Sequence, residues 1–204
     1  MGQAAPFIFL TALAVSLSSL SVSAIDPSAD NFRHVTIFDA PEGRSAMYAS
    51  LVDMGGRELL CGFRTSTLDD GNPWTNLDDE IVCIKSFDGG STWDPLTLTP
   101  VYRDDQMHDY INVAATPLLR DGRVLLTFYQ VAPEHDEGDA STWHAKVRLT
   151  RSANRGKTWS APAVLESPIY SPAAFGGIIR LRDDDLMIVH YGIGSPQRPD
   201  APTY

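Results

Sequence analysis

Residues 86–93 read Ser-Phe-Asp-Gly-Gly-Ser-Thr-Trp, and residues 152–159 read Ser-Ala-Asn-Arg-Gly-Lys-Thr-Trp. Both segments follow the frame S-x-[D/N]-x-G-x-T-W, and their acidic or amide positions lie 66 residues apart (154 − 88 = 66). This composition is typical of a tight turn, because Asp and Asn side chains accept hydrogen bonds from nearby backbone N–H groups and glycine adopts positive φ. We therefore expect two equivalent turns.

A second element repeats at nearly the same spacing. Residues 51–63, 118–129 and 179–191 each combine an apolar strand, a turn rich in Asp or Gly, and a second apolar strand. Their turns are separated by 66 and then by 62 residues (122 − 56 = 66; 184 − 122 = 62). Two elements that share a period indicate a repeat protein.

Each repeat is interpreted as a set of four strands. An Asp-Gly turn between apolar runs is a strong hairpin signal, and it predicts a strand over residues 124–131. Third strands are expected at residues 81–84 and 145–150, and fourth strands near residues 96–98 and 163–165. Apolar residues at helical spacing do not extend over three turns anywhere in the sequence. Four antiparallel strands in about sixty residues are typical of one blade of a β-propeller.

The fixed positions of the eight-residue turn have structural interpretations. The Asp or Asn is expected to accept backbone N–H groups, the glycine to supply positive φ, the threonine hydroxyl to tie the other arm of the hairpin, and the tryptophan to seal an apolar layer. These structural residues are Asp88, Gly90, Trp93, Asn154, Gly156 and Trp159. The alternative, in which Asp88 is a catalytic acid or a calcium ligand, is less economical, because a self-satisfied turn explains every fixed position.

Composition restricts the function. The chain has 204 residues, of which 43% are hydrophobic, and this favours a globular protein over a disordered one. Sixteen basic against 26 acidic residues give a net charge of −10 with no basic cluster, so nucleic acid is not expected as a partner. No motif suggests a metal or a cofactor. Cys61 and Cys83, expected on neighbouring strands, either form a cross-strand disulfide or remain buried thiols.

Residues 1–24 are expected to be a signal peptide. They contain no charged side chain, an apolar run at residues 7–15, and small residues at Val22 and Ala24 before the expected cleavage after Ala24. The alternative is an N-terminal membrane anchor, although the apolar run is short for a bilayer span. We therefore expect a secreted or periplasmic protein without a transmembrane span after cleavage, whose folded domain is residues 25–204.

The eight-residue turn resembles the Asp box, or bacterial neuraminidase repeat, and the strand–turn–strand element resembles blades of the sialidase superfamily. The resemblance covers roughly residues 33–194. It implies an all-β, six-bladed β-propeller of which about two and a half four-stranded blades are present, with Asp boxes at 86–93 and 152–159. Because a closed ring of such repeats needs about twice this length, the sequence is interpreted as an N-terminal fragment.

The same resemblance implies an activity and a mechanism. Sialidases are glycoside hydrolases in which three arginines hold the substrate carboxylate, an Asp is the acid/base residue, and a Tyr activated by a Glu is the nucleophile. The resemblance therefore implies an exported exo-α-sialidase type of hydrolase that acts on terminal sialic acid or a related sugar of glycoconjugates. The fragment by itself is not expected to be active. The alternative is a non-catalytic Asp-box propeller that binds glycans or proteins.

Two arginines are candidate ligands for the substrate carboxylate, because a planar guanidinium binds a carboxylate bidentately. Arg44 opens the stretch that takes the place of the family's R-I-P-x-L motif, although the Ile-Pro pair is missing here. Arg64 ends the next strand, where the alternative is an ordinary salt-bridge partner. His108, before the first strand of the second repeat, is the third candidate substrate contact.

The acid/base residue is expected in the loop at residues 65–80. Asp69, Asp70, Asp78 and Asp79 qualify by position, and Asp70 and Asp79 are the candidates chosen. The resemblance places the nucleophilic Tyr, its Glu partner and the other arginines in later blades, beyond residue 204.

Overall fold

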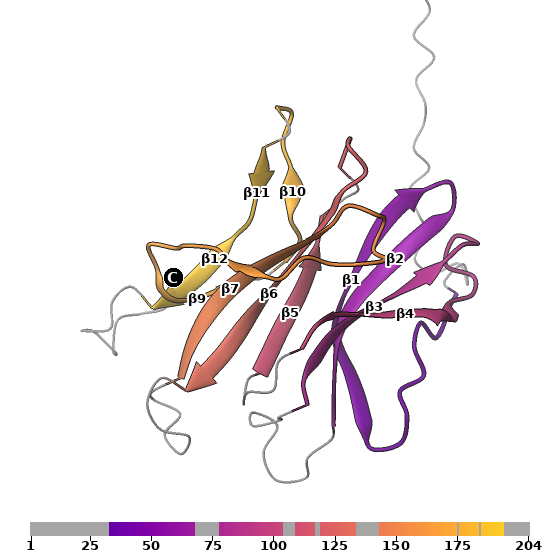
Figure 1. Ribbon diagram of the computed structural model, residues 1–204, viewed down its shortest axis with the longest axis horizontal. Helices are drawn as coiled ribbons and strands as arrows, with labels where there is room; N and C mark the ends of the chain where they lie inside the picture. The colour runs from indigo at the N-terminus through magenta and orange to yellow at the C-terminus, as the bar shows by residue number, and fades with distance from the viewer. Residues whose placement is uncertain are drawn as a thin grey trace, which may run out of the picture. The chain divides into compact units, whose positions relative to one another are not determined.

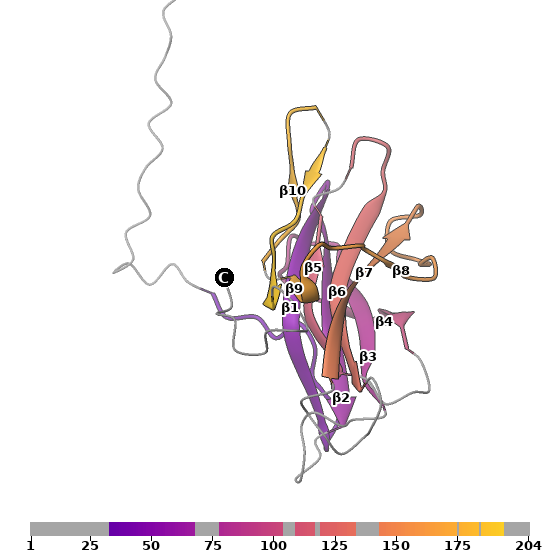
Figure 2. The same cartoon turned by 90° about the vertical axis from the view of Figure 1, so that its left-hand side faces the viewer.

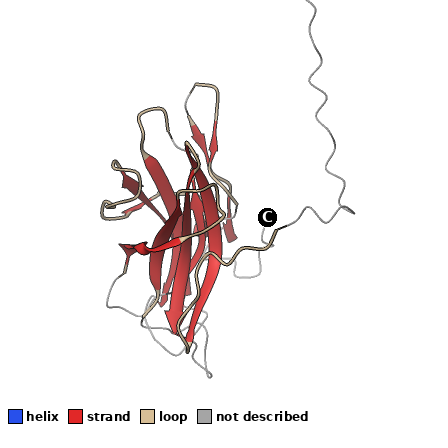
Figure 3. Ribbon diagram, turned by 90° about the vertical axis from the view of Figure 1, so that its right-hand side faces the viewer, coloured by secondary structure: helices blue, strands red, loops and turns tan. Residues whose placement is uncertain are grey.

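The computed structural model describes residues 33–67, 78–103, 109–116, 119–133, 143–174, 176–183 and 185–193. Every regular element in these ranges is a β-strand, and every strand pair is antiparallel, as Figure 3 shows. The prediction of an all-β chain is therefore confirmed for the described residues. The expected signal peptide lies outside them. The described part of the chain has no helix long and apolar enough to cross a membrane.

Two four-stranded sheets follow one another along the chain, each with its strands in sequence order (Figure 1). The first sheet consists of β1 (Arg44–Gly55), β2 (Glu58–Thr67), β3 (Glu80–Ser86) and β4 (Asp94–Tyr102). The second sheet consists of β5 (Asp109–Ala115), β6 (Val124–Pro133), β7 (Trp143–Ser152) and β8 (Ala163–Val164). The strands expected at residues 81–84, 96–98, 124–131 and 145–150 lie within these elements, and β8 ends one residue before the expected limit. The strand expected directly before the turn at Gly122 was placed too late, because β5 ends at Ala115.

The third sequence copy forms a hairpin that is divided into two ladders. It comprises β9 (Tyr170–Ala174), β10 (Ile179–Arg180), β11 (Leu186–Met187) and β12 (His190–Ile193). Strand β9 pairs with β12, and β10 pairs with β11. The third copy at residues 179–191 correctly predicts the turn between β10 and β11, but the main outgoing strand, β9, precedes the residues expected to form it.

Apolar side chains cover both faces of the first sheet. Successive side chains of a strand point to opposite faces. In β2, Leu60 lies on one face, whereas Cys61 and Phe63 lie on the other. The cluster around Leu60 joins the two sheets, and its members are Val52, Met54, Leu60, Ile81, Cys83, Val101, Ala115, Val124, Leu126 and Phe128. On the opposite face, Ile37, Phe38 and Trp93 pack against the cluster around Cys61.

The other face of the second sheet packs against the third hairpin. Tyr129 and Val147 of the sheet form a cluster with Ala173 and Ala174 of β9. Strand β5 contacts β1 and β2, and β9 contacts β6 and β7, so the two sheets and the hairpin are stacked in chain order, from right to left in Figure 1. Figure 2 views this stack from the side of the hairpin. Burial on both faces explains why the inner strands are almost continuously apolar instead of alternating with polar residues.

The two cysteines are free thiols on opposite faces of the first sheet. The β2–β3 register pairs Cys61 with Ile84, and Gly62 with Cys83. Since neighbouring residues of a strand point to opposite sides, the sulfurs cannot meet, and the disulfide alternative is wrong. Burial raises the pKa of Cys61 to about 12 and that of Cys83 to about 11, so both thiols remain protonated at neutral pH.

The turns at 86–93 and 152–159 contain matching hydrogen bonds. The Thr92 N–H donates to Asp88 Oδ1 at 2.9 Å, and the Thr158 N–H donates to Asn154 Oδ1 at 2.9 Å. Gly90 and Gly156 have φ of 83° and 80°. The predicted roles of the Asp or Asn and of the glycine are confirmed, because each turn satisfies its own donors and relies on left-handed backbone.

The threonine hydroxyls act within the turns. Thr92 Oγ1 donates to Asp88 Oδ2 at 2.8 Å, and Asn154 Nδ2 donates to Thr158 Oγ1 at 2.8 Å. The expectation that these hydroxyls tie the other arm of the hairpin is therefore wrong. The physical reason is proximity, because the turn brings side chains four residues apart into direct contact.

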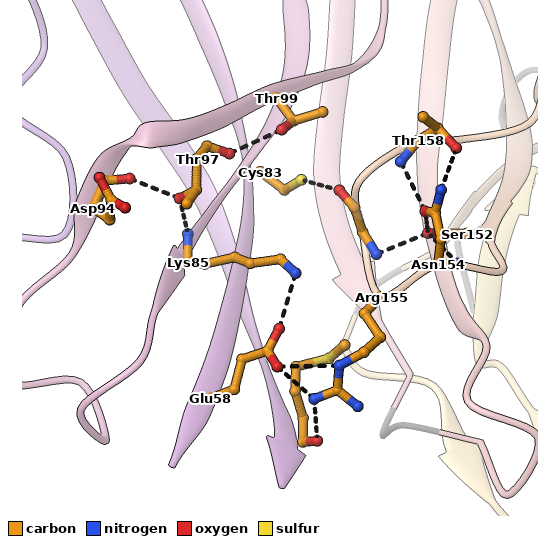
Figure 4. Close-up of polar contacts among 12 residues, drawn as sticks. Glu58, Cys83, Lys85, Asp94, Thr97, Thr99, Ser152, Asn154, Arg155 and Thr158 are labelled. Carbon is orange, nitrogen blue, oxygen red and sulfur yellow. Dashed lines mark hydrogen bonds and ion pairs between the residues drawn. The ribbon is translucent and has the colours of Figure 1, made fainter. Parts of the chain in front are cut away.

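The second turn also contacts the first sheet, and we call this contact the inter-sheet contact (Figure 4). The Cys83 thiol donates to the Gly156 carbonyl at 3.6 Å. Arg155 Nη2 binds Glu58 Oε2 at 2.5 Å and donates to the Met54 carbonyl at 2.8 Å. Lys85 Nζ binds Glu58 Oε1 at 2.9 Å, so one carboxylate joins cations from both sheets.

The tryptophans of the two turns pack on different apolar clusters. Trp159 lies against the cluster that joins the sheets, and Trp93 lies against the opposite face of the first sheet. The prediction that each tryptophan seals an apolar layer is confirmed.

Replacement of Gly156 by alanine is expected to destabilise the fold more than replacement of Gly122. Both glycines have φ of 80°, so both variants strain the backbone by about 1–2 kcal/mol. A Cβ at Gly156 would also overlap Leu60 Cδ1, whereas one at Gly122 meets open space. Urea unfolding should show an additional loss of about 1–3 kcal/mol for Gly156→Ala. Equal losses would contradict the inter-sheet contact.

Glu58→Gln is expected to lower the free energy of unfolding by about 2–3 kcal/mol, because it leaves Lys85 and Arg155 without their carboxylate. Asp121→Asn, which breaks an exposed pair with Arg123, is the matched control and should cost less than about 1 kcal/mol. Chemical denaturation at several pH values measures both.

The pH dependence of the Glu58 effect has a defined sign. Burial raises the pKa of Glu58, but the hydrogen bonds and charges of Lys85 and Arg155 outweigh it and hold the pKa below its ordinary value of 4.5. A carboxyl with a lowered folded-state pKa stabilises the protein fully above the unfolded-state pKa. The difference between wild type and Glu58→Gln should therefore shrink as the pH falls below 4.5. A difference that grew on acidification would exclude this role.

Candidate functional site

The first sheet has a charged end where β1 begins, β2 ends and β3 begins. Arg44 and Arg64 lie there with Asp78 and Asp79, which precede β3. We call this set the arginine–aspartate end. It contains both arginines and one of the two acidic residues selected from the sequence.

Arg64 and Asp79 form a buried ion pair. Arg64 Nη2 lies 2.8 Å from Asp79 Oδ2 and 3.0 Å from Asp79 Oδ1, and the two side chains are 3% and 1% exposed. The alternative interpretation of Arg64 as a salt-bridge partner agrees with this pair, but its burial shows that the pair is not a minor surface contact. A buried pair with two N–H···O contacts orders the strand ends that carry it, because separating the charges would leave each of them unsolvated.

Arg44 and Asp78 form a second, more accessible pair. Arg44 Nη1 lies 2.8 Å from Asp78 Oδ2, and the side chains are 30% and 27% exposed. The Thr67 N–H donates to Asp78 Oδ1 at 3.1 Å, and the Thr67 hydroxyl donates to Asp78 Oδ2. Burial raises the pKa of Asp78, but these hydrogen bonds and the Arg44 charge outweigh it and hold the pKa below its usual value. Asp78 is therefore a carboxylate at neutral pH and is suited to holding a cation.

A β-bulge in β1 separates the two pairs onto opposite faces of the sheet. The ladder pairs Met47 with Arg64 and Ser50 with Gly62, so β1 contains one extra residue near Tyr48, whose φ is 58°. Arg44 pairs with Thr67 and donates from Nε to Thr65 Oγ1, on the face opposite Arg64. The structure therefore brings the two arginines to one end of the sheet but gives each its own aspartate.

The other candidates from the sequence are placed elsewhere. Asp69, Asp70 and His108 lie outside the described residues, so their assignments stay predictions. The structural set in the two eight-residue turns lies at the ends of β3 and β7 away from the arginine–aspartate end. No group of three or more His, Cys, Asp or Glu side chains in the described ranges is arranged to hold a metal ion.

Sequence reasoning missed a buried polar residue in the second sheet. Gln130 is 3% exposed and occupies the position that corresponds to Arg64, 66 residues later (130 − 64 = 66). Its Oε1 accepts a hydrogen bond from Arg148 Nε on the neighbouring strand. The repeat spacing could have identified Gln130, since it aligns this residue with Arg64, a candidate site residue. Both sheets thus bury a long polar side chain at this level.

Comparison with known proteins gives information at the level of the fold. Neither a family model nor a curated protein matches the sequence. The Hadza microbial sialidase Hz136 is 18% identical with a TM-score of 0.57, over 72% of this chain and 32% of that one. Trypanosoma rangeli sialidase is 12% identical with a TM-score of 0.53, over 74% of this chain and 27% of that one. The fold is sialidase-like.

A protein of unknown function from Dyadobacter fermentans has the same type of fold. It is 17% identical with a TM-score of 0.64, and the match covers 79% of this chain and 50% of that one. The chain therefore spans half, or less, of the length of the solved structures that it resembles.

Asp79→Asn is expected to destabilise the sialidase-like fold by about 3 kcal/mol or more, because it removes the negative charge of a buried ion pair with Arg64. Asp78→Asn, at the half-exposed pair, is the matched variant and should cost about 1 kcal/mol. Thermal and urea unfolding measure both effects. If Asp79→Asn were as stable as wild type, Asp79 would not be the structural partner of Arg64.

Proposed function

We propose that this chain is part of an exported, sialidase-like glycoside hydrolase that acts on terminal sialic acid or a related sugar of glycoconjugates. The observation that carries the proposal is the fold likeness to two sialidases. The charged end of the first sheet supports it, because an exo-acting enzyme for an anionic sugar needs guanidinium groups at its site. At these sequence identities, the similarity to the two sialidases gives information about the fold alone. The activity is inferred from the fold together with the charged end of the first sheet.

In this proposal the sheets are blades of a six-bladed β-propeller. The first sheet is one blade, the second sheet is the next, and the third hairpin begins another. The eight-residue turns at 86–93 and 152–159 act as Asp boxes, and their matching hydrogen bonds support this assignment. Residues 1–24 act as the signal peptide, residues 25–204 belong to the propeller domain, and the mature protein is secreted or periplasmic.

The proposed roles of the candidate site residues depend on how exposed their side chains are. Arg44 is the best candidate for a substrate carboxylate ligand, because its guanidinium is partly exposed and is held by Asp78. Arg64 is buried in its pair with Asp79, so it would act mainly by fixing the strand ends around the site. Asp79 and Asp70 remain proposed acid/base residues, and His108 remains a proposed substrate contact. A buried Asp79 would need a rearrangement to reach the substrate, since a general acid must come within hydrogen-bond reach of the leaving group.

The alternative function is a non-catalytic propeller that binds glycans or proteins. The observation that favours it is the pairing of both arginines with aspartates, which offsets the positive charge that a carboxylate clamp requires. Asp88 also fits this alternative, because its turn satisfies it without any ligand.

Release of 4-methylumbelliferone from a sialoside reporter by the complete gene product tests the hydrolase. We expect turnover, and Arg44→Ala should lower kcat/KM about 10–100-fold, because it removes a charge-assisted contact to the substrate. Arg123→Ala, at the exposed turn before β6, is the control and should leave kcat/KM unchanged.

The outcomes separate the two functions. A folded gene product that released no fluorophore but was retained on an array of immobilised glycans would support the binding module and reject the hydrolase. A folded product with neither property would reject both.

A further inference from the structure

A cavity of about 440 Å³ lies between the second sheet and the third hairpin. Its walls come from the beginning of β7 and from the segment that connects β8 to β9. The polar lining includes Lys146, Glu166, Ser167 and Ser171, and the apolar lining includes Leu165 and Ile169. The cavity shares no residue with the two arginine–aspartate pairs, and its size lies within the range of small-ligand sites, roughly 300–1,000 Å³.

The cavity forms because the chain leaves the edge of β7 and then returns to it. Strand β8 pairs with Arg148 and Leu149, and the Leu165 N–H donates to the Val147 carbonyl at 2.8 Å. The next tie is at the start of β9, where Ser171 Oγ accepts a hydrogen bond from the Ala145 N–H at 2.8 Å. The segment between these two ties passes over the strand and forms one wall of a space that remains partly open to solvent.

The backbone at the closing tie is strained and tightly packed. Ser171 has φ of 49°, an unusual value for a residue with a side chain, and strain of this kind is found at ligand sites more often than elsewhere. Behind it, a Cβ at Gly192 would lie 2.7 Å from both the Ser171 carbonyl oxygen and Ile169 Cγ2. The β12 backbone therefore approaches closely enough to hold Ser171 and Ile169 in place.

The serine hydroxyls of the lining are held in place by backbone N–H groups. Ser167 Oγ accepts the Ile169 N–H at 3.2 Å, and Ser171 Oγ accepts the Ala145 N–H. Within the described residues, neither hydroxyl donates a hydrogen bond. A serine hydroxyl carries one O–H donor and two acceptor lone pairs, so each of these groups can still donate a hydrogen bond to a ligand. The lining thus presents two hydroxyl oxygens held by backbone N–H groups, each with an O–H donor.

The charges at the rim oppose each other. Lys146 and Glu166 are both exposed, and within the described part of the chain neither forms an ion pair. An anionic ligand would gain from the ammonium and lose to the carboxylate, and a cationic ligand would do the reverse. The net charge of −10 further disfavours anions. A ligand whose groups both donate and accept hydrogen bonds, and which carries no charge, matches this rim.

We propose that this cavity binds an uncharged sugar residue. Its hydroxyl groups donate to the Glu166 carboxylate and accept from the Lys146 ammonium and from the Ser167 and Ser171 hydroxyls. Its C–H faces pack against Leu165 and Ile169. The proposal concerns binding alone, and it stands whether or not the arginine–aspartate end is catalytic.

Titration of the protein with lactose, followed by saturation-transfer NMR and calorimetry, tests the proposal. Lys146→Gln and Glu166→Gln change exposed side chains and should leave the fold intact, while each raises Kd for lactose about tenfold or more, the loss expected for one charge-assisted hydrogen bond. Lys157→Gln and Asp185→Asn, which alter exposed charges outside the cavity, are the matched controls and should leave Kd unchanged. Ser171→Ala should weaken binding as well, and a thermal melt distinguishes lost binding from lost folding.

Three outcomes would overturn the proposal. The first is the absence of binding by lactose, methyl mannoside and N-acetylglucosamine at millimolar concentration. The second is tighter binding of N-acetylneuraminic acid than of lactose, weakened by Lys146→Gln but not by Glu166→Gln, which would identify an anion site. The third is lactose binding that the cavity variants leave unchanged and Arg44→Ala abolishes, which would place the sugar at the other site.

Discussion

The contact between the second eight-residue turn and the first sheet determines how the successive sheets stack. Gly156 lies against Leu60 and accepts a hydrogen bond from Cys83, while Arg155 of the same turn reaches Glu58 at the start of β2. The turn therefore closes its own hairpin and also contacts the sheet before it. Once this contact is made, Trp159 completes the apolar cluster between the sheets, and the stacking of one sheet on the next follows.

Stacking of this kind buries both faces of a sheet. Polar and charged side chains are therefore found at the ends of its strands. The strand centres carry Leu60, Ile84, Leu126 and similar residues, whereas the paired arginines lie at the end of the first sheet. The cavity between the second sheet and the third hairpin has a different origin, because the inner strand β7 extends beyond its short partner β8, the edge strand of the second sheet. The two candidate sites therefore arise from separate features of the same architecture.

Much of the fold was predictable because it depends on short-range chemistry. The turns at 86–93 and 152–159 satisfy their own donors, and the apolar runs on either side of Gly122 pair across that turn. The site was less predictable. Arg64 was expected at a strand end, but it lies inside β2, which continues to Thr67, and it is buried in a pair with Asp79, fifteen positions later (79 − 64 = 15). The repeat period of the sequence does not indicate which residue pairs with Arg64 or how deeply Arg64 is buried.

The sequence by itself determined the all-β class, the positions of the turns and the backbone hydrogen bonds that the Asp88 and Asn154 side chains accept, since these depend on residues close together in the chain. Only the tertiary structure decided which face each side chain occupies relative to a neighbouring sheet. Cys61 and Cys83 remain apart because the β2–β3 register sends them to opposite faces, and Arg44 and Arg64 are separated because a bulge at Tyr48 shifts β1 by one residue. A shift of one residue in register moves each side chain to the other face of the sheet. The register is set by long-range pairing and packing.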